Sequence, residues 1–176
     1  SCSWSGSKPY SLARQAPRSM FRPVADRHSS AAFNTMPIWR FSIPTGATIS
    51  WLKVETTIRV RYQETDGQRR LHHANYLTYF EVGRTEMLRA TGVTYRDFED
   101  AGLFLVVSEV ACSYRAPADY DDLLIVKTRL EKSGGASLRH AYEIVRGGTI
   151  LATGSTVVVC VDREGRVHRL PEWLRR

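Results

Sequence analysis

The chain has 176 residues, of which 43% are hydrophobic, and this is enough to build the buried core of one ordinary domain. Its formal net charge is +7, but six of the 25 basic residues and only one of the 18 acids fall in residues 1–50, so the rest is nearly balanced. A balanced domain argues against a nucleic-acid-binding protein. No apolar run approaches the roughly 18 residues that span a bilayer. Three scattered cysteines without a C-x-x-C pair argue against a disulfide framework and a structural zinc site.

Residues 1–50 form a distinct segment. They hold five of the seven prolines and ten serines, with little apolar periodicity, which predicts a disordered or loosely attached extension ahead of a domain over residues 51–176. The segment is rich in Arg and Ser and poor in acids, so an organellar transit peptide is one interpretation. A dispensable tail, or upstream sequence ahead of a start at Met20 or Met36, is the other. The cysteine content favours a reducing compartment, so we expect a cytoplasmic protein unless the segment is a transit peptide.

The first half of the domain predicts one strand and one long helix. Residues 54–62 alternate β-branched and polar side chains, as half-buried strands do, and a polar turn over residues 64–70 follows. Residues 74–92 carry apolar side chains at helical spacing, with Asn75 as the expected N-cap and Gly92 as the expected stop. The buried face of this helix is expected to consist of Leu77, Phe80, Met87 and Leu88, with Tyr76 and Tyr79 beside them.

The second half predicts a short helix and a sheet. The helix spans residues 94–102, with Thr94 as its cap and Gly102 as its end. Strand-like runs follow at residues 103–115, 123–132, 137–146 and 149–162. The short links between them, APADYDD, SGGA and GG, are typical of hairpins and favour antiparallel pairing in chain order. The long helix must then lie on one face of this sheet, which makes the domain α+β.

The run YQETDGQRRLHHANYLTYFEVGRTEMLRATG carries a specific combination of residues. A tyrosine and a Thr-Asp pair are followed, seven residues after the Asp, by His-x-Asn-Tyr, and then by a helix with Phe-Glu and Arg. The residues concerned are Tyr62, Thr65, Asp66, His73, Asn75, Tyr76, Phe80, Glu81 and Arg84. The pattern resembles the hotdog-fold acyl-CoA thioesterases, in the group of 4-hydroxybenzoyl-CoA thioesterase and YbgC, and the likeness extends over residues 54–174. Arg69 stands where that family usually carries glycine, which predicts a reshaped turn.

The resemblance implies a hotdog fold, in which a five-stranded antiparallel sheet wraps a long central helix. It also implies a homodimer or homotetramer with active sites at the subunit interface. The implied reaction is hydrolysis of an acyl-CoA thioester to a carboxylic acid and free coenzyme A. No metal and no cofactor is expected, since coenzyme A belongs to the substrate.

Asp66 is the expected catalytic carboxylate. A carboxylate at a polar turn can attack the thioester carbonyl directly, or it can deprotonate a water molecule that does so. The unpaired N–H groups at the start of the helix, near His73 and Ala74, would stabilise the negative charge that develops on the carbonyl oxygen. His73 is expected to orient Asp66 or to hydrogen-bond the thioester. The expected substrate-binding residues are Arg69, Ala74, Asn75 and Tyr76.

Simpler roles stay open for several of these residues. Asp-Gly is a common turn pair, so Asp66 can be a turn residue, and His73 can serve as a capping residue. Glu81 and Arg84 are three positions apart and are expected to form an ion pair. Four cations are candidates for the phosphates of coenzyme A or for solvated strand faces, namely Arg115, Lys127, Lys132 and Arg139.

Two other functions fit the same features. A hotdog dehydratase or hydratase also acts on acyl thioesters with a histidine and a carboxylate, although the spacing between Asp66 and His73 argues against it. A non-catalytic acyl-CoA-binding domain is the second alternative. It stays open because a fold does not fix a function and because Arg69 alters the key turn.

Overall fold

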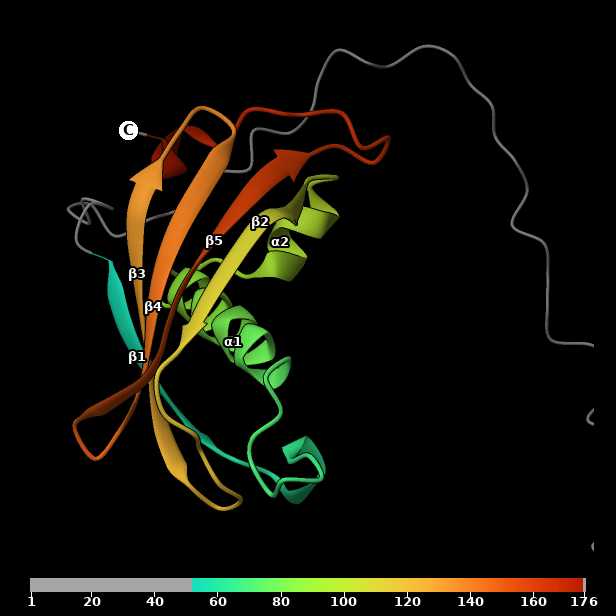
Figure 1. The fold of residues 1–176 in the computed structure, drawn as a ribbon. Helices are drawn as coiled ribbons and strands as arrows, with labels where there is room; N and C mark the ends of the chain where they lie inside the picture. Colours follow the sequence, from blue (N-terminus) through green and yellow to red (C-terminus); the bar gives the residue numbers. More distant parts are fainter. Residues whose placement is uncertain (1–51, 176) are drawn as a thin grey trace, which may run out of the picture. The chain divides into compact units, whose positions relative to one another are not determined.

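The computed structural model describes residues 52–175, so residues 1–50, predicted to be disordered, lie outside the described residues. The described part is a five-stranded antiparallel sheet with the long helix α1 against one face and the short helix α2 beside it (Figure 1). The elements in chain order are β1 (Lys53–Arg59), the 3-10 helix η2 (Tyr62–Glu64), α1 (Asn75–Arg89), α2 (Tyr95–Asp100), β2 (Phe104–Tyr114), β3 (Leu123–Ser133), β4 (Ser137–Arg146), β5 (Thr149–Val161) and the 3-10 helix η3 (Glu172–Leu174). The predicted hotdog fold is confirmed. None of these helices is long and apolar enough to cross a membrane.

The strand order in the sheet is β1-β3-β4-β5-β2, and all neighbours are antiparallel. The predicted hairpins that join β3 to β4 and β4 to β5 are confirmed. The prediction that residues 103–115 pair with residues 123–132 is wrong. Instead β2 pairs with β5 and stands at the sheet edge, with β1 at the opposite edge.

The link between β2 and β3, residues 116–122, accounts for this difference. It contains no glycine, the residue that tight hairpin turns favour. It packs instead against the segments that flank the polar turn. Ala118 is fully buried and its carbonyl accepts a hydrogen bond from the N–H of Leu71 across 2.8 Å. The N–H of Val60 donates to the carbonyl of Asp122 across 3.0 Å, so the link delivers the chain to the side of β1 rather than back along β2.

One face of α1 is buried against the sheet. Its buried residues recur every three or four positions, as predicted, and they are Tyr76, Tyr79, Phe80, Gly83, Arg84, Met87 and Leu88. The prediction for Leu77 is wrong, because this side chain is 36% exposed. Each residue of a helix turns the side-chain direction by roughly 100°, so Leu77 points away from the face that Tyr76 and Tyr79 share. The two tyrosines fill the core at the start of α1.

The helix and the sheet approach each other closely at Gly154 on β5. A Cβ atom added there would overlap the ring of Phe80, which stacks on Tyr142 with 4.4 Å between ring centroids. Gly83 on α1 has the same relation to the side chain of Thr128 on β3. These two glycines let the sheet backbone and the helix backbone come together, which fixes the position of α1 and of the turn that precedes it.

The capping residues predicted for the two helices are confirmed only in part. Thr94 caps α2 as predicted, since its hydroxyl accepts from the N–H of Asp97 across 3.3 Å and its N–H donates to the Asp97 carboxylate across 2.7 Å. The predicted N-cap of α1 is wrong, because Ala74 occupies that position. The side chain of Asn75 donates instead to the carbonyl of Glu64 across 2.7 Å, which draws it away from the helix end.

Candidate active site

An open hollow of about 450 Å³ lies between the turn that precedes α1 and the end of β2. The predicted site residues in its wall are Asp66, His73 and Tyr76. The other residues of its wall are Gln68, Leu71, Tyr114, Arg115, Ala116 and Pro117. The predicted site residues outside the wall are Arg69, Ala74 and Asn75. The fold therefore brings the two predicted catalytic side chains to one open surface.

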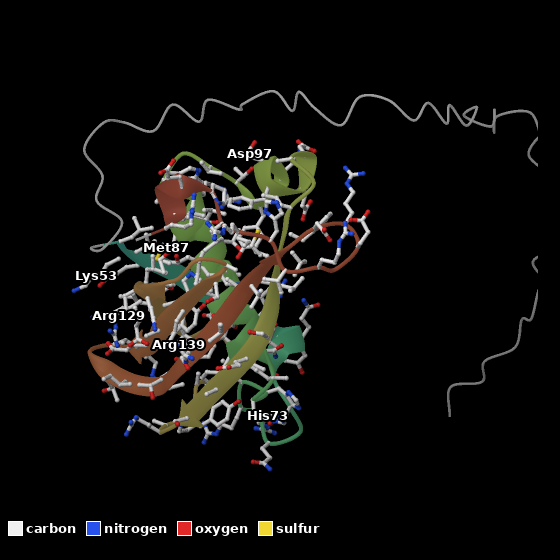
Figure 2. All side chains as sticks on the ribbon, turned by 90° about the horizontal axis from the view of Figure 1, so that it is seen from above. Lys53, His73, Met87, Asp97, Arg129 and Arg139 are labelled. Carbon is white, nitrogen blue, oxygen red and sulfur yellow. The ribbon has the colours of Figure 1, made fainter. Side chains whose placement is uncertain are left out.

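A larger hollow of about 660 Å³ lies on the face of the sheet turned away from α1. Its floor consists of small outward-facing residues such as Ala141 and Ser155. Figure 2 shows Lys53 and Arg129, from its wall, at one side of the domain and His73 at another. None of the predicted catalytic or thioester-contacting residues lines it, although Lys127, a candidate cation for the phosphates of coenzyme A, does. The smaller hollow is therefore the candidate active site, because the predicted catalytic side chains of Asp66 and His73 line it.

Asp66 is half-buried and is held by its own turn. Its Oδ1 accepts hydrogen bonds from the N–H of Gln68 across 2.8 Å and from the N–H of Arg70 across 3.3 Å. Its second carboxylate oxygen accepts no hydrogen bond within residues 52–175. Arg69 has a φ of 63°, the left-handed conformation that glycine favours. Arg69 therefore adopts a backbone conformation that glycine reaches more easily than a residue with a Cβ atom.

The segment before α1 borders the same hollow through His73. The N–H of Ala74 donates to Nδ1 of His72 across 3.2 Å, which occupies one of the two N–H groups predicted to bind the thioester oxygen. The N–H of His73 has no acceptor within residues 52–175. The hydroxyl of Tyr114 donates to the carbonyl of His73 across 3.0 Å. The imidazole of His73 is exposed and makes no hydrogen bond to Asp66 in the described part of the chain.

Glu64, two residues before Asp66, ties this turn to α1. Its carboxylate accepts from the hydroxyl of Tyr79 across 2.8 Å and from Nη2 of Arg61 across 2.7 Å. Burial raises the pKa of Glu64, but the hydrogen bonds from Arg61 and Tyr79 outweigh burial and hold the pKa below its usual value. Burial, together with the neighbouring Glu64, raises the pKa of Tyr79. The pair therefore consists of a carboxylate and a protonated phenol at neutral pH.

The sequence analysis missed Tyr114, which lines the hollow, and Glu64, which contacts both the segment before α1 and α1 itself. Glu64 belongs to the polar run over residues 64–70, which predicts only a turn, and its burial depends on contact with Tyr79. Tyr114 ends an apolar strand and is followed by Arg115, and this change from apolar to polar side chains is a usable signal. The ring of Tyr114 lies edge-on to that of Tyr76, with 5.1 Å between centroids.

The cations predicted as candidates for the phosphates of coenzyme A differ in whether they line the hollow. Arg115 lines the hollow. Lys127 lies 3.7 Å from the Glu55 carboxylate, and Arg139 lies 3.3 Å from that of Glu109, both on the sheet away from the hollow. The predicted ion pair between Glu81 and Arg84 is confirmed, with 3.1 Å between the charged atoms. Within residues 52–175, no group of three His, Cys, Asp or Glu side chains is placed to hold a metal ion.

Comparison with known proteins decides the family. The family model described as the thioesterase-like superfamily matches residues 60–176. The chain belongs to this superfamily. This thioesterase-like chain is 36% identical over 106 residues to the acyl-CoA thioesterase YbgC of Haemophilus influenzae, and the match covers 60% of the chain and 78% of that relative.

Solved structures agree with this assignment. A crystal structure of a hypothetical protein from Aquifex aeolicus matches with a TM-score of 0.66 and 32% identity, over 69% of this thioesterase-like chain and 99% of that chain. A crystal structure of a DHNA-CoA thioesterase from Staphylococcus aureus matches with a TM-score of 0.66 and 32% identity, over 67% and 80% of the two chains. The resemblance to the YbgC group of hotdog thioesterases, and the assignment to a family of thioester hydrolases, are thereby confirmed.

Proposed function

We propose that this protein hydrolyses an acyl-CoA thioester to a free carboxylic acid and coenzyme A, with Asp66 as nucleophile or general base. One observation carries the proposal: the Asp66 carboxylate and the segment that starts α1 border the same open hollow. The relatives support the substrate class, since YbgC of Haemophilus influenzae is named an acyl-CoA thioesterase and the Staphylococcus aureus neighbour a DHNA-CoA thioesterase.

In the general-base route, Asp66 removes a proton from a water molecule whose oxygen attacks the thioester carbon. In the nucleophilic route, the carboxylate attacks that carbon itself, and water then hydrolyses the resulting anhydride. Both routes break the C–S bond and release coenzyme A as a thiolate that takes up a proton. The carboxylate oxygen of Asp66 that accepts no hydrogen bond within residues 52–175 suits either route.

The negative charge that develops on the carbonyl oxygen needs a donor. The N–H of His73 suits this role, because the neighbouring N–H of Ala74 already donates to His72. The start of α1 adds a partial positive charge of roughly half an elementary unit. The His73 imidazole, Ala74, Asn75, Tyr76 and Arg69 stay predicted contacts of the thioester or acyl group. Arg115 lines the hollow and is the best-placed of the predicted cations for a phosphate of coenzyme A.

We infer that a second copy of the chain covers β2. This edge strand exposes Val106 by 43% and both Val107 and Val110 by 48%. An exposed apolar edge strand promotes uncontrolled pairing unless another chain covers it. Because the hollow lies at the end of β2, a copy paired along β2 would border it, in line with the predicted homodimer or homotetramer. The predicted cytoplasmic location, with an organellar one as the alternative, rests on the sequence alone.

The test is thiol release by the full chain from acyl-CoA substrates with short, long and aromatic acyl groups. Asp66→Asn keeps the shape and the turn but loses charge and basicity, so we expect a loss of about a hundredfold or more in kcat. Asp162→Asn is the control, because Oδ1 of Asp162 also holds its own turn through two N–H groups, those of Glu164 and Arg166 at 3.0 and 2.9 Å. Its Oδ2 additionally accepts from Nε of Arg166 across 2.9 Å.

Wild-type activity in Asp66→Asn would reduce Asp66 to a turn residue. Binding of acyl-CoA without thiol release by the wild type would replace the hydrolase with a binding module. Addition of water to an enoyl-CoA, measured on the same protein, would favour the hydratase alternative. Near-equal losses in Asp66→Asn and Asp162→Asn would show that both act through folding.

A further inference from the structure

We propose that Glu64 is a positioning residue for hydrolysis: its buried carboxylate and its carbonyl hold the Asp66 turn in register with the start of α1. The inference rests on the proposed thioesterase function. Glu64 does not line the hollow, so it acts through Asp66 and the α1 segment rather than on the substrate.

The carboxylate of Glu64 makes three hydrogen bonds. Oε2 accepts from the N–H of Arg61 across 2.7 Å and from the hydroxyl of Tyr79 across 2.8 Å, while Oε1 accepts from Nη2 of Arg61 across 2.7 Å. The Glu64 side chain is 6% exposed and that of Arg61 is 63% exposed. The carboxylate of Glu64 is thus buried and hydrogen-bonded through both oxygens, and donors from the N-cap of η2 and from α1 fix its direction.

The backbone of the same residue makes a second set of bonds. The carbonyl of Glu64 accepts from the N–H of His72 across 2.9 Å and from the side-chain amide of Asn75 across 2.7 Å. Asp66 follows Glu64 by two residues, and His73 lies between the two donors in the chain. One residue therefore joins the turn that carries the carboxylate to the segment that carries the free N–H.

A role in stability alone explains this arrangement poorly. An ion pair is weak evidence for stability, because exposed pairs contribute little and well-packed apolar residues often stabilise a fold as well as a buried pair does. Hydrogen bonds to a charged carboxylate, by contrast, fix direction as well as distance. Catalysis needs that accuracy, since a displacement of about 1 Å in a reacting group can lower the rate about a hundredfold. The charged carboxylate of Glu64 therefore fixes the position of the Asp66 turn relative to α1 more accurately than apolar packing would.

The experiment compares Glu64→Gln, Tyr79→Phe and Tyr142→Phe in the full chain. Tyr79→Phe removes one donor to Glu64 and leaves Arg61 in place. Tyr142→Phe is the matched control, since it removes another buried hydroxyl, which lies 2.7 Å from that of Thr156 on the sheet. Three quantities are measured for each protein: the folded fraction by circular dichroism, kcat per folded molecule, and the Kd of a non-hydrolysable thioether analogue of acyl-CoA.

We expect Glu64→Gln and Tyr79→Phe to lower kcat about tenfold or more, because the reacting groups move out of register. The Kd of the thioether analogue should change by less than about twofold, and Tyr142→Phe should retain kcat within about twofold. If Glu64→Gln fails to fold, Tyr79→Phe alone decides, because it keeps the charged pair.

Unchanged kcat per folded molecule in Tyr79→Phe and Glu64→Gln would overturn the inference and leave Glu64 a stabilising residue. A rise in the Kd of the analogue that matches the fall in kcat would also overturn it, since Glu64 would then support binding. Asp66→Asn separates the two proposals. Its inactivity alongside a fully active Glu64→Gln would refute only the positioning role, whereas an active Asp66→Asn would refute the proposed role of Asp66 itself.

Discussion

The N–H of Arg69 donates to the carbonyl of Asp66 across 2.9 Å, and Arg69 closes this turn with a φ of 63°. A residue with a Cβ atom is strained in this conformation by roughly 1–2 kcal/mol. We expect Arg69→Gly to relieve the strain and to raise the free energy of unfolding by about 0.5–1 kcal/mol, after the greater freedom of glycine in the unfolded chain is subtracted. Urea unfolding measures the change.

The neighbouring Gln68→Gly is the control, because Gln68 does not have a positive φ. That substitution should lower the free energy of unfolding by roughly 0.5–1 kcal/mol. Two variants with losses of equal size would mean that Arg69 is unstrained, because only the entropy cost of glycine would then remain.

The positions of the strands and helices could be predicted from the sequence. The strands and helices were located to within a few residues, since alternation and helical spacing are local properties of the chain. The convergence of Asp66 and His73 on one hollow followed from the family resemblance, not from periodicity. The fixed spacing of the motif carried that information.

Features that depend on distant partners were not predicted. The pairing of β2 with β5 depends on where the link over residues 116–122 packs, and short links alone favoured the wrong neighbour. Asn75 is a favourable N-cap residue, but its side chain donates to the carbonyl of Glu64 instead. The burial of Glu64 required Tyr79, fifteen residues later in the chain. In each case a tertiary contact overrode a local preference.

The close approach at Gly154 predicts a sharp loss of stability in Gly154→Ala. The added methyl group would overlap the ring of Phe80 and the carbonyl of Ala111, so the helix and the sheet must separate. We expect the free energy of unfolding to fall by about 1–3 kcal/mol, as is typical of overpacked cores. Gly135→Ala is the control, because its added Cβ atom meets no neighbour within 4 Å. A milder effect at Gly154 than at Gly135 would mean that the sheet yields easily there.

The hydrogen bond from Tyr114 to the carbonyl of His73 predicts a kinetic effect. Tyr114→Phe keeps the edge-on contact with Tyr76 but releases the peptide group that precedes α1. A hydrogen bond of this kind is worth about 0.5–1.5 kcal/mol, so kcat should fall by roughly two- to twelvefold. Tyr120→Phe, at a ring that is 56% exposed and edge-on to Tyr62, should leave kcat unchanged. Equal activity of Tyr114→Phe and the wild type would remove Tyr114 from the site.

The exposed β2 edge predicts that assembly depends on Val110. A lysine there places a charge on the apolar strip, and edge lysines block strand pairing in natural sheets. Val110→Lys should therefore shift the mass measured by light scattering from an oligomer towards the monomer. Val167→Lys is the control, since Val167 is 70% exposed and lies outside β2. A wild-type mass in Val110→Lys would place the subunit contact elsewhere.

The buried histidine on β4 predicts a pH dependence of stability. His140 is 4% exposed, and burial, followed by the charge of Arg84, lowers its pKa from 6.5 to about 4. Between these two values the unfolded chain binds a proton that the folded chain rejects, so stability falls as the pH decreases through that window. The full stability is present above the unfolded pKa. From about pH 7.5 to about pH 5 the expected loss in the free energy of unfolding is about 2 kcal/mol.

His140→Leu should flatten this dependence, because leucine binds no proton and suits the surrounding leucines at Leu130 and Leu138. The measurement is urea unfolding at the two pH values for wild type, His140→Leu and His168→Leu. His168 is exposed, so its variant should lose stability like the wild type. Keeping the comparison above about pH 5 separates it from the carboxylate Glu64, whose lowered pKa makes its stabilisation disappear only in stronger acid. A His140→Leu protein that loses as much stability as the wild type would mean that the protonated imidazole is accommodated beside Arg84.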